Sequence, residues 1–233
     1  MIVMLNKINK ELTLTIVIPV YNEEDHLKAC LDSIANQTVK PDKVVVVDNN
    51  SVDMSVVIAS KYSFVEIVPE KKQGIVFARN KGFNQVTTNL IGRIDADTVL
   101  ASNWVESVLL LATKNSNVAA FTGPCYFNFK PGMSLWYGIH RILYFWSSRI
   151  LFGHTVLFGS NMLIRKEAWD SVKYITCLDN SIHEDMDLSH HLYENGFTPM
   201  FTSSMRATIS IRRFKHGWRY PKMWLKTKIV HIR

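Results

Sequence analysis

Hydrophobic and polar positions over the first hundred residues follow two alternating patterns. Short apolar, β-branched runs are separated by segments in which apolar side chains recur at helical spacing. One run holds four consecutive valines, which is typical of a strand buried on both faces. The predicted elements are a strand at 12–20, a helix at 23–35, a strand at 43–48, a short helix from about residue 53, a strand at 64–68, a helix at 75–85 and a strand at 90–95. This order predicts an α/β fold in which a parallel sheet carries helices on both faces.

Polar clusters follow three of the predicted strands. They are Tyr21-Asn22-Glu23, Asp48-Asn49-Asn50 and Asp95-Ala96-Asp97. In parallel α/β sheets, ligands bind beyond the carboxyl ends of the strands, so these clusters are expected to share one site. Because side chains at i and i+2 of a strand share a face, Asp95 and Asp97 are expected to point at one place. Their oxygens would suit a hard divalent cation that carries a diphosphate, whereas an isolated Asp-x-Asp is more often a solvated turn.

Length and composition favour one globular core. The chain has 233 residues, of which 47% are hydrophobic. Its cysteines, Cys30, Cys125 and Cys177, are odd in number and far apart, which indicates neither a disulfide framework nor a zinc knuckle and favours a reducing compartment. Residues 1–11 resemble neither a signal peptide nor a membrane span. We therefore expect a cytoplasmic protein.

The net charge of +7 is concentrated at one end of the chain. Residues 195–233 contain nine of the 27 Lys and Arg residues and none of the 20 Asp and Glu residues. Aromatic side chains are interleaved with these cations, which suits an anionic membrane surface or phosphate groups. A solvated basic face would have the same sequence pattern. Nucleic acid is not an expected partner, because no nucleic-acid motif accompanies the charge.

Four segments, in order, resemble the signatures of family 2 glycosyltransferases. They are Thr15-Ile16-Val17-Ile18-Pro19-Val20-Tyr21-Asn22-Glu23-Glu24, then Val45-Val46-Val47-Asp48-Asn49-Asn50-Ser51-Val52-Asp53, then residues 74–82, and then Asp95-Ala96-Asp97. The resemblance is close over residues 12–100 and looser to about residue 218. It implies a GT-A fold, meaning a Rossmann-like, mixed, mostly parallel sheet flanked by helices, with an acceptor-side C-terminal half. It also implies a nucleotide-diphosphate sugar donor, Mg²⁺ or Mn²⁺, and inversion at the anomeric carbon.

The resemblance implies one catalytic domain over residues 1–233. Residues 12–100 would form its nucleotide-sugar-binding half, residues 101–211 its acceptor-binding half, and residues 212–233 a basic aromatic tail. The stretch 133–158 is rich in aromatic residues but is interrupted by arginine and histidine. Two interpretations stay open for it, a core helix under the acceptor loop and an interfacial helix at a membrane.

Six residues of the first half, with Asp95 among them, are implied to bind the nucleotide. Pro19 and Tyr21 would line the base pocket, with Glu23 beside them. Asp48 would accept a hydrogen bond from N3 of uracil, which favours a UDP-sugar. Arg79 would close over the nucleotide. The alternatives are a turn-capping aromatic residue for Tyr21, a turn former for Asp48, and a helix-surface salt bridge for Arg79. The Asn49-Asn50 pair stands where many relatives have an acidic residue and glycine, which weakens the assignment of the base.

The resemblance also implies a metal site. Asp97 would bind the metal, and Asp95 would face the ribose and the metal shell. His216 would complete that shell, while Arg212 and Arg213 would grip the diphosphate; a basic strand end would explain these three residues as well. The surrounding segment lacks the Gln and the adjacent Arg-Trp of processive polysaccharide synthases, so processive synthesis is disfavoured.

The second half is expected to supply the acceptor site and the base. Residues 159–166 resemble the glycine-containing segment of the family, where Gly159 would allow close backbone approach and Asn161 would contact the acceptor or the diphosphate. Glu184 and Asp185 resemble the Glu-Asp motif at the start of a helix that stops at Gly196. Asp185 would be the general base, because a helix N-terminus favours its ionised form. Acidic residues in a first turn also serve the helix dipole alone.

Together these features predict an inverting, hexosyltransferase-type enzyme. It would move a sugar from a UDP-sugar to a hydroxyl of a lipid-linked or cell-envelope saccharide, at the inner face of the membrane. Two alternatives stay open, a catalytically silent nucleotide-sugar or membrane-surface binding module and a nucleotidyltransferase. The second usually needs a glycine-rich, lysine-bearing phosphate loop near its first strand, and residues 21–24 do not supply one.

Overall fold

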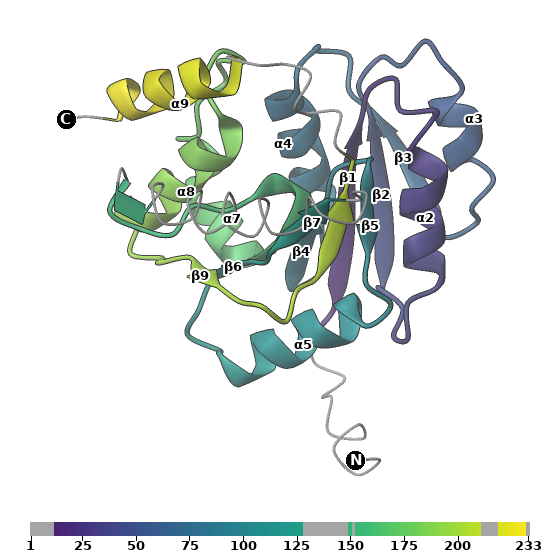
Figure 1. Ribbon diagram of the computed structural model, residues 1–233, viewed down its shortest axis with the longest axis horizontal. Helices are drawn as coiled ribbons and strands as arrows, with labels where there is room; N and C mark the ends of the chain where they lie inside the picture. Colours follow the sequence, from purple (N-terminus) through teal and green to yellow (C-terminus); the bar gives the residue numbers. More distant parts are fainter. Residues whose placement is uncertain (1–11, 128–148, 151, 211–218, 232–233) are drawn as a thin grey trace.

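The computed structural model describes residues 12–127, 149–150, 152–210 and 219–231 (Figure 1). Its main sheet has seven strands in the spatial order β3-β2-β1-β4-β8-β6-β9. The strands are β3 (Val65–Pro69), β2 (Lys43–Asp48), β1 (Leu14–Val20), β4 (Leu90–Arg93), β8 (Met162–Arg165), β6 (Ala120–Thr122) and β9 (Met200–Phe201). Only β8 is antiparallel to its neighbours among the described pairs. The predicted mixed, mostly parallel sheet is confirmed.

Helices cover both faces of this sheet. One face packs against α2 (Leu27–Ala35), α3 (Ser55–Ala59) and α5 (Trp104–Lys114). The other packs against α4 (Ile75–Gln85), α7 (Lys166–Val172) and α8 (Glu184–Glu194). The central strand β1 serves both layers, since Ile16 and Ile18 join the first core and Val17 joins the second. A strand buried on both faces needs apolar residues throughout, which explains its unbroken apolar run.

A second, three-stranded sheet and a last helix complete the described structure. The small sheet has the order β5-β10-β7, with β5 (Thr98–Leu100), β10 (Ala207–Ile209) and β7 (Cys125–Phe127). A short 3₁₀ helix, η1 (Gly159–Asn161), precedes β8. Figure 1 shows α9 (Arg219–Val230), in yellow, beside α8 and far from α3. None of the described helices has both the length and the apolar content that crossing a membrane requires.

Two predicted boundaries are wrong. The helix predicted from residue 23 begins at Leu27, after a turn. The fourth strand ends at Arg93, two residues before Asp95. Pairing of β4 with β1 stops at Arg93, and pairing with β8 stops there too because η1 precedes that strand. Without a ladder on either side, residues 94–97 form a turn in place of a strand.

Several predictions lie outside the described residues. They concern Arg212, Arg213, His216 and most of the aromatic stretch 133–158.

Candidate functional site

The carboxyl ends of β1, β2 and β4 meet at one edge of the main sheet. Val20 at the end of β1 is in register with Asp48 at the end of β2. The loops that follow are joined by hydrogen bonds, since the Asn22 backbone N–H donates to Ser51 Oγ (3.2 Å) and the Val52 N–H donates to Asn22 Oδ1 (2.9 Å). Two of the three predicted polar clusters therefore form one surface.

Asparagines give this surface its backbone shape. Asn22 and Asn50 have φ angles of +53° and +66°, in the left-handed region that asparagine tolerates better than most residues with a Cβ. Asn50 thus adopts a conformation that glycine adopts more readily. The Asn49 side chain is buried and donates to the backbone oxygens of Glu70 and Lys72 (2.9 and 2.8 Å), which fixes the loop before α4.

Asp95 and Asp97 lie in the turn between β4 and β5, and both are nearly buried. The turn is closed by a hydrogen bond from the Thr98 N–H to the Asp95 backbone oxygen (3.0 Å). Asp95 Oδ1 lies 2.9 Å from Arg93 Nη2, and Asp95 Oδ2 accepts from Ser160 Oγ. The expected strand geometry for this pair is therefore wrong, and a hydrogen-bonded turn orients Asp95 in its place.

Arg93 is the centre of the buried charges at this edge. Its side chain is 2% exposed, and its guanidinium contacts three carboxylates: Asp95 at 2.9 Å, Glu184 at 3.3 Å and Asp185 at 3.2 Å. The planar fork of arginine can serve several acceptors at once, which lysine cannot do with the same geometry. Arg93 thereby ties the turn after β4 to the first turn of α8. Sequence reasoning missed it, although an arginine between Gly92 and Ile94 in an apolar run was an available signal.

Gly159 allows η1 to approach this centre closely. Its backbone N–H donates to Asp185 Oδ2 at 2.8 Å. A Cβ at this position would lie 1.2 Å from Arg93 Nη1, so no other residue fits without moving the guanidinium. The structure confirms close approach at this glycine, and the neighbour that it accommodates is Arg93.

Glu184 and Asp185 have pKa values that move in opposite directions. Burial raises the pKa of Glu184, but neighbouring basic side chains outweigh burial and hold this pKa below its usual range; these side chains are His183, Arg93 and Arg79. Burial and then the charge of Glu184 raise the pKa of Asp185, against the opposing effect of Arg93. Burial of Asp185 therefore acts against the expected effect of the helix N-terminus on this pKa.

The predicted nucleotide residues lie near the same edge but differ in exposure. Tyr21 is half exposed after β1, and Pro19 is inside β1. Asp48 Oδ1 accepts a hydrogen bond from the Ser51 N–H at 3.1 Å, which is the contact expected if Asp48 serves to form the turn after β2. Arg79 is fully buried, and its Nη1 donates to the Glu184 backbone oxygen at 2.8 Å. The surface salt bridge considered for Arg79 is therefore wrong, while nucleotide contacts of these residues stay predictions.

Asn161 has a structural role in place of the predicted contact with the acceptor or the diphosphate. Its side chain is fully buried. Oδ1 accepts from the indole N–H of Trp104 (2.9 Å), and Nδ2 donates to the backbone oxygens of Pro124 and Met205 (3.0 and 2.9 Å). The glycine-containing segment was a correct signal for the site, but the residues that reach it are Gly159 and Ser160.

The residues at the end of β4 fit a divalent metal of the hard type. Asp97 offers carboxylate oxygens, which Mg²⁺ and Mn²⁺ prefer over nitrogen or sulfur. Asp95 offers the same chemistry, although Arg93 and Ser160 already orient both of its oxygens. The binding of a cation by either carboxylate stays a prediction.

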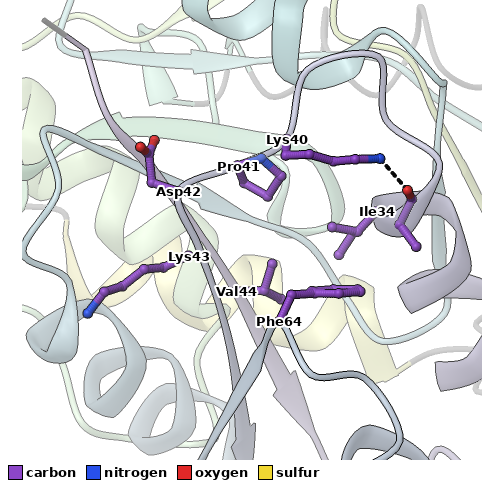
Figure 2. A pocket seen from close by; sticks show the side chains of 8 residues that line it. Ile34, Lys40, Pro41, Asp42, Lys43, Val44 and Phe64 are labelled. Carbon is purple, nitrogen blue, oxygen red and sulfur yellow. Dashed lines mark hydrogen bonds between the residues drawn. The ribbon is translucent and has the colours of Figure 1, made fainter. Parts of the chain in front are cut away.

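A cavity of about 400 Å³ lies elsewhere, at the amino end of β2. Figure 2 shows Pro41, Val44 and Phe64 around it, and the dashed line marks the bond from Lys40 Nζ to the Ala35 oxygen. β2 begins at Lys43 and ends at Asp48, so this cavity and the polar edge are at opposite ends of the strand. It is not part of the candidate site.

A comparison with known families matches residues 15–172, more than half of the chain, to a family described as "Glycosyl transferase family 2". Among curated proteins, "Glycosyltransferase GlyA" of Streptococcus pneumoniae is 34% identical over 99 residues, which cover 41% of this chain and 14% of that protein. The chain thus spans a small part of this relative.

Solved structures with the same fold include two proteins that are bound to a nucleotide sugar. The mannosyltransferase PcManGT from Pyrobaculum calidifontis, in complex with GDP-Man and Mn²⁺, has a TM-score of 0.71 at 19% identity, over 91% of this chain and 61% of that chain. TarS 1-349 of S. aureus, in complex with UDP-GlcNAc, has a TM-score of 0.68 at 17% identity, over 86% of this chain and 59% of that chain. The expected GT-A fold is confirmed.

Proposed function

This chain belongs to glycosyl transferase family 2, and we propose that it transfers a sugar from a nucleotide-diphosphate sugar to a hydroxyl group with inversion. We propose a UDP-sugar as the donor and a lipid-linked or cell-envelope saccharide as the acceptor. The observation that supports this proposal most is that Arg93 contacts both Asp95 and Asp185. It couples a carboxylate of the proposed donor side to the proposed base.

The proposed reaction is one displacement. Asp185 takes the proton of the acceptor hydroxyl while that oxygen forms a bond to the anomeric carbon. The bond from this carbon to the diphosphate oxygen breaks on the opposite face, and its electron pair leaves with the nucleotide diphosphate. Arg93 and the Gly159 N–H hold the two oxygens of Asp185, so they orient the base before the acceptor arrives.

On the donor side, Tyr21 would stack on the base and Asp48 would accept from it. Pro19 and Glu23 complete the proposed pocket. Arg79 would close over the nucleotide, and it also donates a hydrogen bond to the backbone oxygen of Glu184 at the start of α8. A Mg²⁺ or Mn²⁺ ion held by Asp97, with Asp95 and His216 as further proposed ligands, would neutralise the leaving diphosphate. PcManGT holds Mn²⁺ with its nucleotide sugar, which supports such an ion here.

A donor panel tests the proposed function. Purified protein is incubated with UDP- and GDP-sugars in Mg²⁺, in Mn²⁺ or in EDTA, and release of the nucleotide diphosphate is measured. We expect release from at least one UDP-sugar, dependent on the metal. Donor binding with no turnover in the presence of saccharide acceptors would favour a silent binding module. Release of pyrophosphate from a nucleoside triphosphate would favour a nucleotidyltransferase.

We further propose that α9 holds the protein at an anionic membrane surface. Its outer side exposes Leu225 (64%), Ile229 (60%) and the basic Lys222. Exposed apolar residues next to cations are typical of helices that lie in a lipid interface. This position would bring the proposed site near a lipid-linked acceptor.

Liposome flotation tests the membrane proposal. The protein is expected to float with vesicles that contain anionic lipid and to stay in solution with neutral vesicles, because the cations of α9 need anionic headgroups. Leu225→Glu with Ile229→Glu should abolish flotation. Val57→Glu, at an exposed residue of α3, which lies far from α9 (Figure 1), should not change it. Equal recovery with both vesicle types would contradict the proposal.

A further inference from the structure

Four side chains with metal-binding atoms meet on the side of α8 next to α9. They are Cys177, Asp187, His191 and His231, and one ligand atom of each lies within 4.8 Å of the other three. Asp187 is fully buried and the other three are partly buried. These residues come from the segment after α7, from α8 and from the position after α9, so folding alone brings them together.

This cluster is separate from the site around Arg93. Asp185 and Asp187 are two positions apart in one helix, and such residues point to opposite sides. Asp185 contacts Arg93 and Gly159, whereas Asp187 contacts His191 and His231. Asp187 and His191 are one turn apart and therefore share a face.

Asp187 is oriented as a metal ligand would be. Its Oδ2 accepts from the Cys177 backbone N–H at 3.0 Å. Its Oδ1 lies 3.0 Å from His231 Nε2 and 3.3 Å from His191 Nε2, so two ring nitrogens converge on one oxygen. A hydrogen bond from the backbone to the second oxygen of a ligating carboxylate is a common feature of metal sites.

We propose that this cluster is a structural zinc site. Two imidazoles, one thiolate and one carboxylate form a closed, four-coordinate set of the kind that Zn²⁺ prefers, and the thiolate disfavours the hard ions Mg²⁺ and Mn²⁺. With Zn–ligand bonds of about 2.0–2.3 Å, ligand atoms in a tetrahedral site are about 3–4 Å apart, so small side-chain movements close this cluster on the ion. Binding would release the proton of the Cys177 thiol.

The zinc ion would fix the end of α9 to α8 and to the segment after α7. His231 is the one ligand that follows α9. Other described contacts of α9 include the hydrogen bond from the His183 N–H to Thr227 Oγ1 (2.8 Å) and the ion pair of Lys226 with Asp179 (3.1 Å). The ion would add a coordination bond at the end of the helix. Its position beside Asp187 would also fix the first turn of α8, which carries Glu184 and Asp185.

The first test uses zinc alone, without nucleotide. The full chain is loaded with Zn²⁺, dialysed against metal-free buffer and analysed by mass spectrometry of the metal; we expect about one zinc per chain. Zinc at about 100 times its Kd should raise Tm by about 5–10 °C. Co²⁺ in place of zinc should give a thiolate charge-transfer band. A native protein that keeps no zinc after dialysis would overturn the proposal.

Single variants separate this site from the proposed donor metal. Cys177→Ser and His231→Ala are expected to keep their fold, since one residue lies in a loop and the other follows the last helix, but to lose the bound zinc and its Tm shift. Cys177→Ser should also lose the cobalt band. Cys125→Ser, His26→Ala and Asp97→Asn should retain one zinc. Zinc content unchanged in both Cys177→Ser and His231→Ala would show binding elsewhere and would also overturn the proposal.

Discussion

Asp185→Asn is expected to lower the rate of sugar transfer about 10²- to 10⁴-fold, as removal of a general base typically does. The amide oxygen can still accept from the Gly159 N–H, and Arg93 keeps Asp95 and Glu184 as partners. Three carboxylates around one guanidinium become two, so the fold should tolerate the change. Kd for the donor should therefore remain close to the native value, which isothermal titration can measure.

The matched control is Asp170→Asn on α7. Asp170 is also a carboxylate in ion pairs, with Lys166 and Lys173, but it is on the surface and away from Arg93. Its transfer rate should equal that of the native enzyme. If Asp185→Asn transfers sugar within a factor of ten of the native rate, Asp185 is not the base. If donor affinity falls as much as the rate, Asp185 belongs to the donor site.

Arg93→Met is expected to lower the free energy of unfolding by about 3–5 kcal/mol, the usual cost of removing one partner from a buried ion pair. Asp95, Glu184 and Asp185 would remain buried with no guanidinium between them. For a chain of this size, that loss corresponds to a fall in Tm of about 6–20 °C. Differential scanning calorimetry would measure it.

Two further variants serve as controls for the change in Tm of Arg93→Met. Lys173→Met removes a partly exposed cation from its pair with Asp170 and should change Tm little. Arg93→Lys keeps the charge but loses the fork, so its Tm should lie between those of Arg93→Met and the native protein. An Arg93→Met protein with native Tm would contradict the central role of this residue.

Much of the fold was predictable because its signals are local. Strand and helix periodicity in residues 12–95 identified seven elements in the right order, with errors only at their ends. The parallel arrangement then predicted a shared edge for the polar clusters after β1, β2 and β4. The end of β4 was not predictable, since it depends on where η1 interrupts pairing with β8, a strand that lies far along the chain.

The candidate site was predictable only in part. Asp95, Glu184 and Asp185 carried a motif, and the structure brings these three carboxylates together around Arg93, while their roles stay predictions. Arg93 and Ser160 were missed, because the role of each depends on the carboxylates that folding places next to it. Asn161 was misassigned for the same reason: its amide is bonded to partners from three distant segments.

The sequence by itself determined the order of the elements, the family and the position of the acidic motifs, since each of these depends on neighbouring residues. Only the tertiary structure decided which charges share Arg93 and which side of α8 each carboxylate of the first turn faces. It also decided that Cys177 and His231 meet Asp187 and His191. Spacing along a chain fixes contacts within a helix or a strand, whereas contacts between distant segments are fixed by packing.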